Sequence, residues 1–170
     1  MSKNLKEKIE KNKKKLYSTN DKYKIFTKEL LEFLGDDFIR APASTMKSLH
    51  NAFPGGLIDH IILTTKYGVD INLSLPENIR VDNSSLIKVC FLHQMYEFKD
   101  DIVSMRVGER SAYYSLKYGV QLSEEEYQSI INYDKPDDDK QSKWYSTTLA
   151  TILKQANELA IIEEKTLNNG

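Results

Sequence analysis

The sequence is poor in the residues that cross-link small folds or break helices. It has one cysteine, four prolines and seven glycines among 170 residues. A single cysteine excludes an intrachain disulfide framework and any zinc site built on Cys-x-x-Cys pairs, and it fits a reducing compartment. Histidine is also scarce, with only three in the chain, so the positions of the histidines are informative.

Two further absences restrict the partners and the location of the protein. No stretch approaches the roughly 18 apolar residues that a membrane helix needs, and the start, Met-Ser-Lys-Asn-Leu-Lys-Glu-Lys, lacks the apolar run of a signal peptide. The 24 basic and 25 acidic side chains leave a net charge of −1, so there is no global field to attract nucleic acid. We therefore expect a cytoplasmic protein that has no membrane partner.

The hydrophobic pattern is helical along most of the chain. Apolar residues recur at helical spacing in segments near 57–74, 83–93, 109–118, 124–133 and 147–165. The only strand signal is a short hairpin pattern over 98–107, and Pro42 permits a helical turn over 43–49. The sequence therefore predicts an all-α fold, a compact single-domain bundle of six to eight helices.

Capping residues predict where several of these helices begin and end. A helix is expected to start near Ser18–Asp21 and to stop at Gly35, and another to end at Leu75-Pro76. Asp82 begins the next helix, and Ser123 to Glu126 forms a capping box. The last helix is expected to bury Leu149, Ile152, Leu153, Ala156, Leu159 and Ala160.

Residues 3–15 carry seven lysines around a narrow apolar side formed by Leu5, Ile9 and Leu16. One interpretation is an arm that contacts nucleic-acid phosphates. We favour a plain solvated helix, because no aromatic side chain is interleaved before Tyr17. The chain is accordingly divided into a Lys-rich N-terminal helix or arm, 1–18, and a helical domain, 19–170.

The three histidines lie at breaks or ends of the two most apolar predicted helices. His50 opens the segment His50-Asn-Ala-Phe-Pro-Gly-Gly-Leu-Ile-Asp-His60, and His93 ends the helix that contains Val89-Cys-Phe-Leu. A lone histidine is usually a satisfied core or surface residue. Three histidines beside the same two helices instead suggest a shared site.

The run His50-x4-Gly55-Gly56-Leu57-x-Asp59-His60 resembles a motif of HD-domain metal-dependent phosphohydrolases, above all their small phage-type members. Later segments are similar in order and spacing: Gly108-Glu-Arg-Ser111, Tyr118-Gly119-Val120, Leu122-Ser-Glu-Glu-Glu-Tyr127-x-x-Ile130 and Ala156-x3-Ala160-x2-Glu163. The resemblance covers roughly residues 30–165. It implies a compact helical fold in which two His and two Asp hold one metal ion, and a phage-encoded protein of the host cytoplasm.

Two positions depart from that pattern. By the resemblance, His60 matches the first metal ligand and His93 the His of the His-Asp pair, but Gln94 and Asn157 stand where the two Asp are expected. Hard divalent cations prefer anionic oxygen ligands, whereas Asn and Gln offer a neutral carbonyl oxygen. We therefore expect no cofactor or, if one binds, a single divalent transition metal (Mn, Ni, Zn or Fe).

One acidic residue has the spacing to replace a lost carboxylate. Glu97 lies four residues after His93, on the same face if the helix continues; the alternative is an exposed acid beyond the helix end. Asp59 and Glu158 adjoin the ligand positions, but neighbouring residues on a helix point about 100° apart, so they are poor substitutes.

Three functions follow as hypotheses. The first is a degenerate HD-domain-like protein that binds a nucleotide or a protein partner, with His50 and Arg110 as candidate ligand or phosphate contacts. The second is an active phosphohydrolase on nucleotides or nucleic-acid ends with an atypical metal site. The third is nucleic-acid binding through the Lys-rich N-terminal helix.

Overall fold

The computed structural model describes four stretches of the chain, residues 3–44, 51–95, 105–135 and 146–168. Within them there are seven α-helices, one short 3-10 helix and no strand. The elements are α1 (Lys3–Tyr23), α2 (Lys28–Arg40), α3 (Gly56–Ser74), η1 (Glu77–Ile79), α4 (Asn83–Leu92), α5 (Val107–Lys117), α6 (Glu124–Asn132) and α8 (Thr148–Asn168). The predicted all-α class, with six to eight helices, is confirmed.

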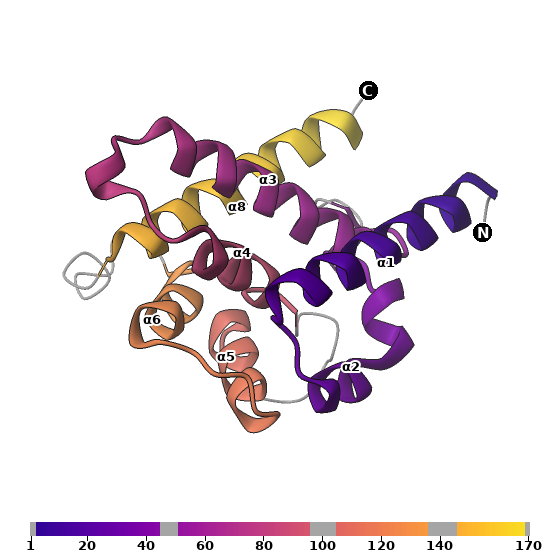
Figure 1. Cartoon of the computed structure of the whole chain (residues 1–170). Helices are drawn as coiled ribbons and strands as arrows, with labels where there is room; N and C mark the ends of the chain where they lie inside the picture. Colours follow the sequence, from indigo (N-terminus) through magenta and orange to yellow (C-terminus); the bar gives the residue numbers. More distant parts are fainter. Residues whose placement is uncertain (1–2, 45–50, 96–104, 136–145, 169–170) are drawn as a thin grey trace.

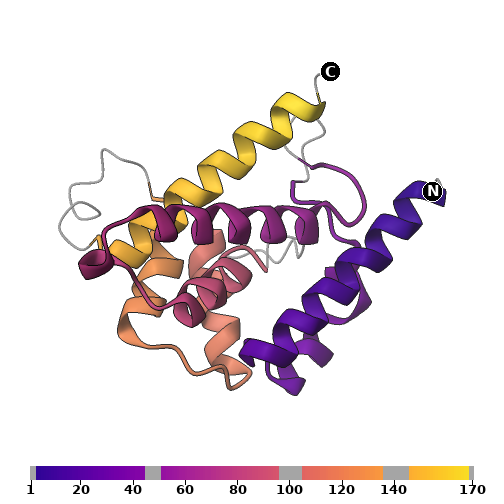
Figure 2. The same cartoon turned by 45° about the horizontal axis from the view of Figure 1, so that its top comes forward.

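Helices α3 and α8 pack side by side in antiparallel directions and form the most extensive helix pair (Figures 1 and 2). Helix α4 lies against both of them, and α1 lies on the side of the molecule away from α6. The helices approach closely at Gly68 of α3, where an added Cβ would lie 3.2 Å from Cys90 Sγ and 3.7 Å from Ala156 Cβ. A small residue at this point lets α3 contact both neighbours.

The centre of the core is α4, as its apolar sequence predicts. Six consecutive or near-consecutive residues of this helix are buried: Leu86, Ile87, Val89, Cys90, Phe91 and Leu92. A helix that is apolar on most sides must be surrounded by other elements, since burying a large apolar side chain stabilises the fold by about 1.5–3 kcal/mol. This placement brings the C-terminal end of α4, and His93 with it, into the interior.

Several predicted boundaries are confirmed. The Asp82 side chain accepts a hydrogen bond from the Ser85 backbone at 2.9 Å and caps α4. The Ser123–Glu126 capping box begins α6. Helix α3 ends at Ser74, directly before Leu75-Pro76. These signals are local in the sequence, so they could be identified without knowledge of the tertiary contacts.

The predicted helix start at Ser18–Asp21 and the predicted stop at Gly35 are wrong in part. Helix α1 continues through these residues to Tyr23, because the Asn20 side chain is buried and accepts a hydrogen bond from the Phe26 backbone at 2.7 Å. Thr27 instead caps α2. Gly35, with φ of 61°, kinks α2 without ending it, and the helix resumes to Arg40.

The burial predicted for Leu159 is also wrong, since 40% of this residue is exposed. The inward stripe of α8 runs through Leu153, Ala156, Ala160 and Glu164, and Leu159 lies beside it. The hairpin predicted over 98–107 and the helical turn predicted over 43–49 lie largely outside the described residues. The division of the chain at residue 18 stays a prediction.

The glycine pair at the start of α3 is required for two separate structural reasons. Gly55 has a φ of 84°, in the left-handed region that favours glycine, and its Cβ would lie 2.6 Å from Ile9 Cγ1. A Cβ on Gly56 would lie 2.0 Å from the backbone oxygen of Asn51. The pair therefore fixes where α3 begins, and with it the direction in which His60 points one turn later.

Candidate functional site

Four polar side chains from three helices meet inside the core. His60 belongs to α3, His93 caps the end of α4, and Asn157 and Glu164 belong to α8. Asn157 and Glu164 are seven residues apart, which places them on one face of the helix, two turns from each other. His60 and His93 are fully buried, and Glu164 is 3% and Asn157 9% exposed.

Both ring nitrogens of His60 have polar neighbours on α8. Nδ1 lies 3.0 Å and 3.1 Å from the two carboxylate oxygens of Glu164. Nε2 lies 2.9 Å from Asn157 Oδ1 and 3.3 Å from the hydroxyl oxygen of Thr64, one turn further along α3. The ring is therefore held from both sides, with the carboxylate on the Nδ1 side.

His93 is oriented by the backbone of its own helix. Its Nδ1 lies 2.7 Å from the Cys90 carbonyl oxygen, and its Nε2 lies 3.4 Å from Asn157 Oδ1. The Tyr133 ring packs edge-on against it, with 4.8 Å between ring centroids. The centroids of the two imidazoles are 5.8 Å apart, so the Asn157 amide is the group that links them.

These contacts determine where the protons lie. A backbone carbonyl only accepts hydrogen bonds, so His93 Nδ1 donates to Cys90 and a neutral His93 carries a lone pair at Nε2. Burial lowers the pKa of His60 to about 4. Burial, with the charge of His60 adding to it, lowers the pKa of His93 to about 3. Both rings are therefore neutral at pH 7.

The orientation of the Asn157 amide decides whether the cluster is complete in itself. With Nδ1 of His60 donating to the Glu164 carboxylate, both Nε2 atoms present lone pairs to Asn157. If the amide NH₂ faces the rings, its two N–H groups can donate to both lone pairs, and the cluster is complete without any further group. If the amide oxygen faces them, three lone pairs converge, which is the arrangement that a metal cation stabilises.

The predicted site residues differ in how far the structure brings them together. His60, His93 and Asn157 are in mutual contact. Gln94 follows His93 and is buried, but its Oε1 has no hydrogen-bond partner in the described part of the chain. Arg110 is half-buried on α5, a helix that packs against α6 and α4. Two further predicted contacts, His50 and Glu97, lie outside the described residues.

The two acids judged to be poor substitutes point elsewhere. Asp59 pairs with Lys8 and Asn12 of α1, and Glu158 is exposed on α8. Sequence reasoning missed Glu164, Thr64 and Tyr133. Glu164 had a usable signal, since it lies on the same face of the last helix as Asn157. The sequence carried no signal for the edge-on contact of Tyr133, because this contact depends on how α6 ends beside α4.

Two pockets are lined by residues of α1 and α3. One, of about 280 Å³, is formed by α1, α3 and α4, and the other, of about 370 Å³, by α1, α3 and α8 together with residues of the segment before α3. Glu164 lines the second pocket, but neither pocket is lined by His60 or His93. The second pocket therefore meets the cluster at the Glu164 side chain.

Within residues 3–44, 51–95, 105–135 and 146–168, no group of three or more His, Cys, Asp or Glu side chains is placed to hold a metal ion. In the same stretches, no helix has the length and apolar character needed to cross a bilayer. No family model, no curated protein and no solved structure matches the chain.

Proposed function

We propose that this chain is a catalytically degenerate HD-domain-like protein of phage type, which acts by binding a nucleotide or a protein partner. The observation that carries the proposal is the position of Asn157, whose amide lies within 2.9 Å and 3.4 Å of the two Nε2 atoms. An amide in this position can complete the hydrogen bonds of both rings. The histidines then orient the helices rather than a reacting group.

The charge of the cluster supports this proposal. The groups that face the Nε2 atoms from the described residues are an amide and a hydroxyl, both neutral. The nearby carboxylate, Glu164, contacts the opposite ring nitrogen of His60. A hard cation such as Mg²⁺ prefers several anionic or carbonyl oxygens. This donor set does not fit such a cation.

The burial of the two histidines also supports the proposed loss of catalysis. His60 and His93 are fully buried, and the Tyr133 ring covers one side of His93. A hydrolase must admit both its substrate and a water molecule to the reacting atoms. Neither of the two pockets described above is lined by His60 or His93.

Two observations favour the alternative, a phosphohydrolase with an atypical metal site. Two ligand atoms that each lie about 2.1 Å from one metal ion, with an angle of about 90–110° at the metal, are about 3.0–3.4 Å apart. The distances from Asn157 Oδ1 to the two Nε2 atoms, 2.9 Å and 3.4 Å, are close to this range. Gln94 Oε1, next to His93 in the sequence, is buried and has no hydrogen-bond partner among the described residues. His60, His93 and Asn157 would hold a borderline metal, which would supply an activated water.

Metal analysis of the purified full-length protein separates the two functions. The degenerate protein is expected to carry no stoichiometric Mn, Fe, Ni or Zn, and to show no turnover of nucleotides when Mn²⁺ or Ni²⁺ is added. The double variant Gln94→Asp/Asn157→Asp restores two carboxylates, and it is expected to bind Mn²⁺ at one ion per chain by calorimetry. The same double variant with His60→Ala is the matched control and is expected to lose that ion.

Either of two results would overturn the proposal. One is a stoichiometric metal in the natural protein that disappears in His60→Ala. The other is nucleotide hydrolysis by the natural protein that depends on the added metal and is lost in the same variant. Circular dichroism of each variant shows whether the helical fold is retained.

A further inference from the structure

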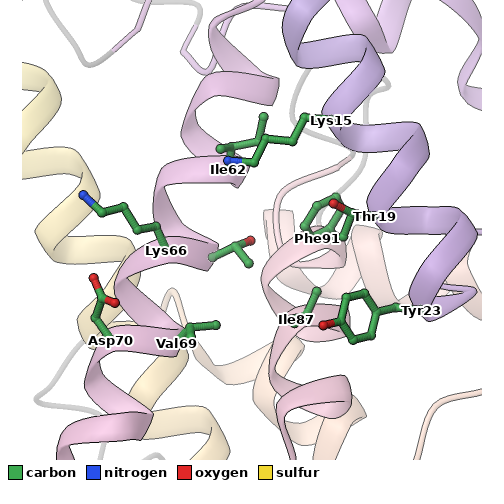
Figure 3. A pocket seen from close by; sticks show the side chains of 10 residues that line it. Lys15, Thr19, Tyr23, Ile62, Lys66, Val69, Asp70, Ile87 and Phe91 are labelled. Carbon is green, nitrogen blue, oxygen red and sulfur yellow. The ribbon is translucent and has the colours of Figure 1, made fainter.

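The 280 Å³ pocket is built from one face of each of three helices (Figure 3). Helix α1 contributes Lys15, Thr19 and Tyr23, which are four residues apart and therefore lie in one row. Helix α4 contributes Ile87 and Phe91, also four apart, as the floor. The contribution of α3 is Ile62, Thr65, Lys66, Val69 and Asp70. The spacing of these residues on regular helices gives the pocket a defined shape.

The lining separates into an apolar body and a charged edge. Ile87 and Phe91 are buried, and Ile62, Val69 and the Tyr23 ring are half-buried around them. The side chain of Lys15 extends from α1 towards α3 in Figure 3, while Lys66 and Asp70 lie on α3 at the rim. Binding pockets for small molecules typically combine a mostly apolar lining with a few polar groups that fix orientation.

The neighbouring 370 Å³ pocket shares Lys15, Ile62 and Lys66 with the first, so the two pockets adjoin at these residues beside α3. We call the two adjoining pockets the groove. Its acidic residues already have cationic or hydrogen-bonding partners. Asp59 pairs with Lys8, Glu163 accepts from the Tyr67 hydroxyl, and Glu164 contacts His60.

The two shared lysines lack such acidic partners. Within the described residues, Lys15 and Lys66 form no ion pair; the Lys66 ammonium lies 5.9 Å from the Tyr67 ring centroid. The junction of the two pockets therefore carries two ammonium groups beside a mostly apolar lining, in which Asp70 is the acidic residue of the 280 Å³ pocket. A ligand that neutralises them needs a negative charge next to an apolar body.

We infer that this groove, Lys15 and Lys66 with the cavity over Phe91, binds a small organic anion that has an apolar body. The apolar body lies between Tyr23, Val69 and Phe91, and the anionic group lies between the two ammonium groups. The inference deepens the proposed function, on which it rests, by assigning the ligand site to the α1–α3 groove rather than to the histidine cluster.

The probe is 8-anilinonaphthalene-1-sulfonate, which combines an apolar aromatic body with a sulfonate. Titration into the folded full-length protein is expected to show one saturable site by fluorescence and calorimetry. The variant Lys15→Gln/Lys66→Gln is expected to weaken binding about tenfold at low salt, because it removes both exposed ammonium groups that attract the sulfonate. Val69→Phe, which fills the cavity without a change of charge, is expected to abolish the site.

Matched controls separate the groove from general surface charge. Lys11→Gln/Lys14→Gln removes two exposed charges from α1 outside both pockets, and Leu73→Phe enlarges an exposed residue of α3 beyond them. Neither control is expected to change the affinity. The inference is overturned if no saturable binding occurs, or if the groove variants bind as tightly as the controls while thermal melts show all variants folded.

Failure of this inference can be told apart from failure of the proposed function. Metal content and nucleotide turnover test the function through His60, which the groove variants leave intact. A metal-free protein without dye binding would retain the proposed function and lose this site. A metal-dependent hydrolase that binds the dye in the groove would overturn the proposed function and retain this site.

Discussion

Nδ1 of His60 lies 3.0 Å from Oε1 of Glu164, which is 104 residues further along the chain, and both side chains are buried. This contact joins the first turns of α3 to the last turns of α8. It also determines which nitrogen of His60 carries the proton, and so what the other nitrogen offers to Asn157. The arrangement of the histidine cluster therefore depends on a carboxylate that stands outside the expected ligand positions.

Removing that carboxylate should destabilise the fold. In Glu164→Leu the buried Nδ1 of His60 loses its acceptor, and an unsatisfied buried donor costs about 1–3 kcal/mol. We expect the free energy of unfolding, measured by urea titration, to fall by about 2 kcal/mol. Glu163→Leu is the control, since its half-buried carboxylate accepts from the Tyr67 hydroxyl at the surface of the same helix pair. Equal losses in the two variants would contradict this prediction.

The buried histidines should make stability depend on pH. The pKa of His60 is lowered to about 4 and that of His93 to about 3, both from 6.5. Near and below pH 6.5 the unfolded chain binds protons that the folded chain does not bind. The free energy of unfolding therefore falls as the pH falls from about 7.5 towards 4, and it is nearly constant above that range. The slope approaches about 1.4 kcal/mol per pH unit for each histidine.

Urea titrations between pH 5 and pH 7.5 test this dependence in a range above the titration of most carboxylates. The variant His93→Gln removes one of the two titrating rings, and its slope is expected to be about half that of the natural protein. A slope that is the same in the variant and the natural protein would show that His93 does not contribute.

Gly56, the first residue of α3, should tolerate no side chain. In Gly56→Ala the new Cβ would lie 2.0 Å from the Asn51 backbone oxygen, which cannot move aside without displacing the start of α3. We expect a loss of more than about 2 kcal/mol in the free energy of unfolding, as for other overpacked sites. Gly68→Ala is the control, because its nearest atom is the Cys90 side-chain sulfur at 3.2 Å, and it should cost less.

The Lys-rich helix should behave as part of the folded unit. Leu16 of α1 is fully buried, and Leu16→Ala is expected to lower the free energy of unfolding by about 2–5 kcal/mol. Tyr17→Ala, at a position that is 39% exposed, is expected to change it by less than about 1 kcal/mol. A destabilisation of Leu16→Ala no larger than that of Tyr17→Ala would contradict this prediction.

The same burial determines how the nucleic-acid hypothesis can be tested. Deleting residues 1–16 would remove the buried Ile9 and Leu16 from the core and would confound loss of binding with unfolding. Substituting exposed lysines such as Lys11 and Lys14 by Gln keeps the core and removes charge. Binding to nucleic acid through this helix would then weaken and lose part of its salt dependence.

The sequence by itself determined the helical class, the buried position of α4, and the starts of α4 and α6. Each depends on spacing or capping within a few residues, where helix geometry alone decides the outcome. It also singled out His60, His93 and Asn157, which the structure brings into contact. Local patterns were less successful where a tertiary contact determines the helix boundary. At Ser18–Asp21 the sequence predicted a helix start, but the burial of Asn20 extends α1 to Tyr23.

Only the tertiary structure decided what the histidine cluster contains. The Glu164 carboxylate, the Cys90 carbonyl and the Tyr133 ring meet the two histidines because α3, α4, α6 and α8 converge there. The groove beside Lys15 and Lys66 likewise exists only where α1 crosses α3 over the end of α4. Periodicity assigns a residue to a face of its own helix, whereas the packing of side chains from distant helices decides which faces meet.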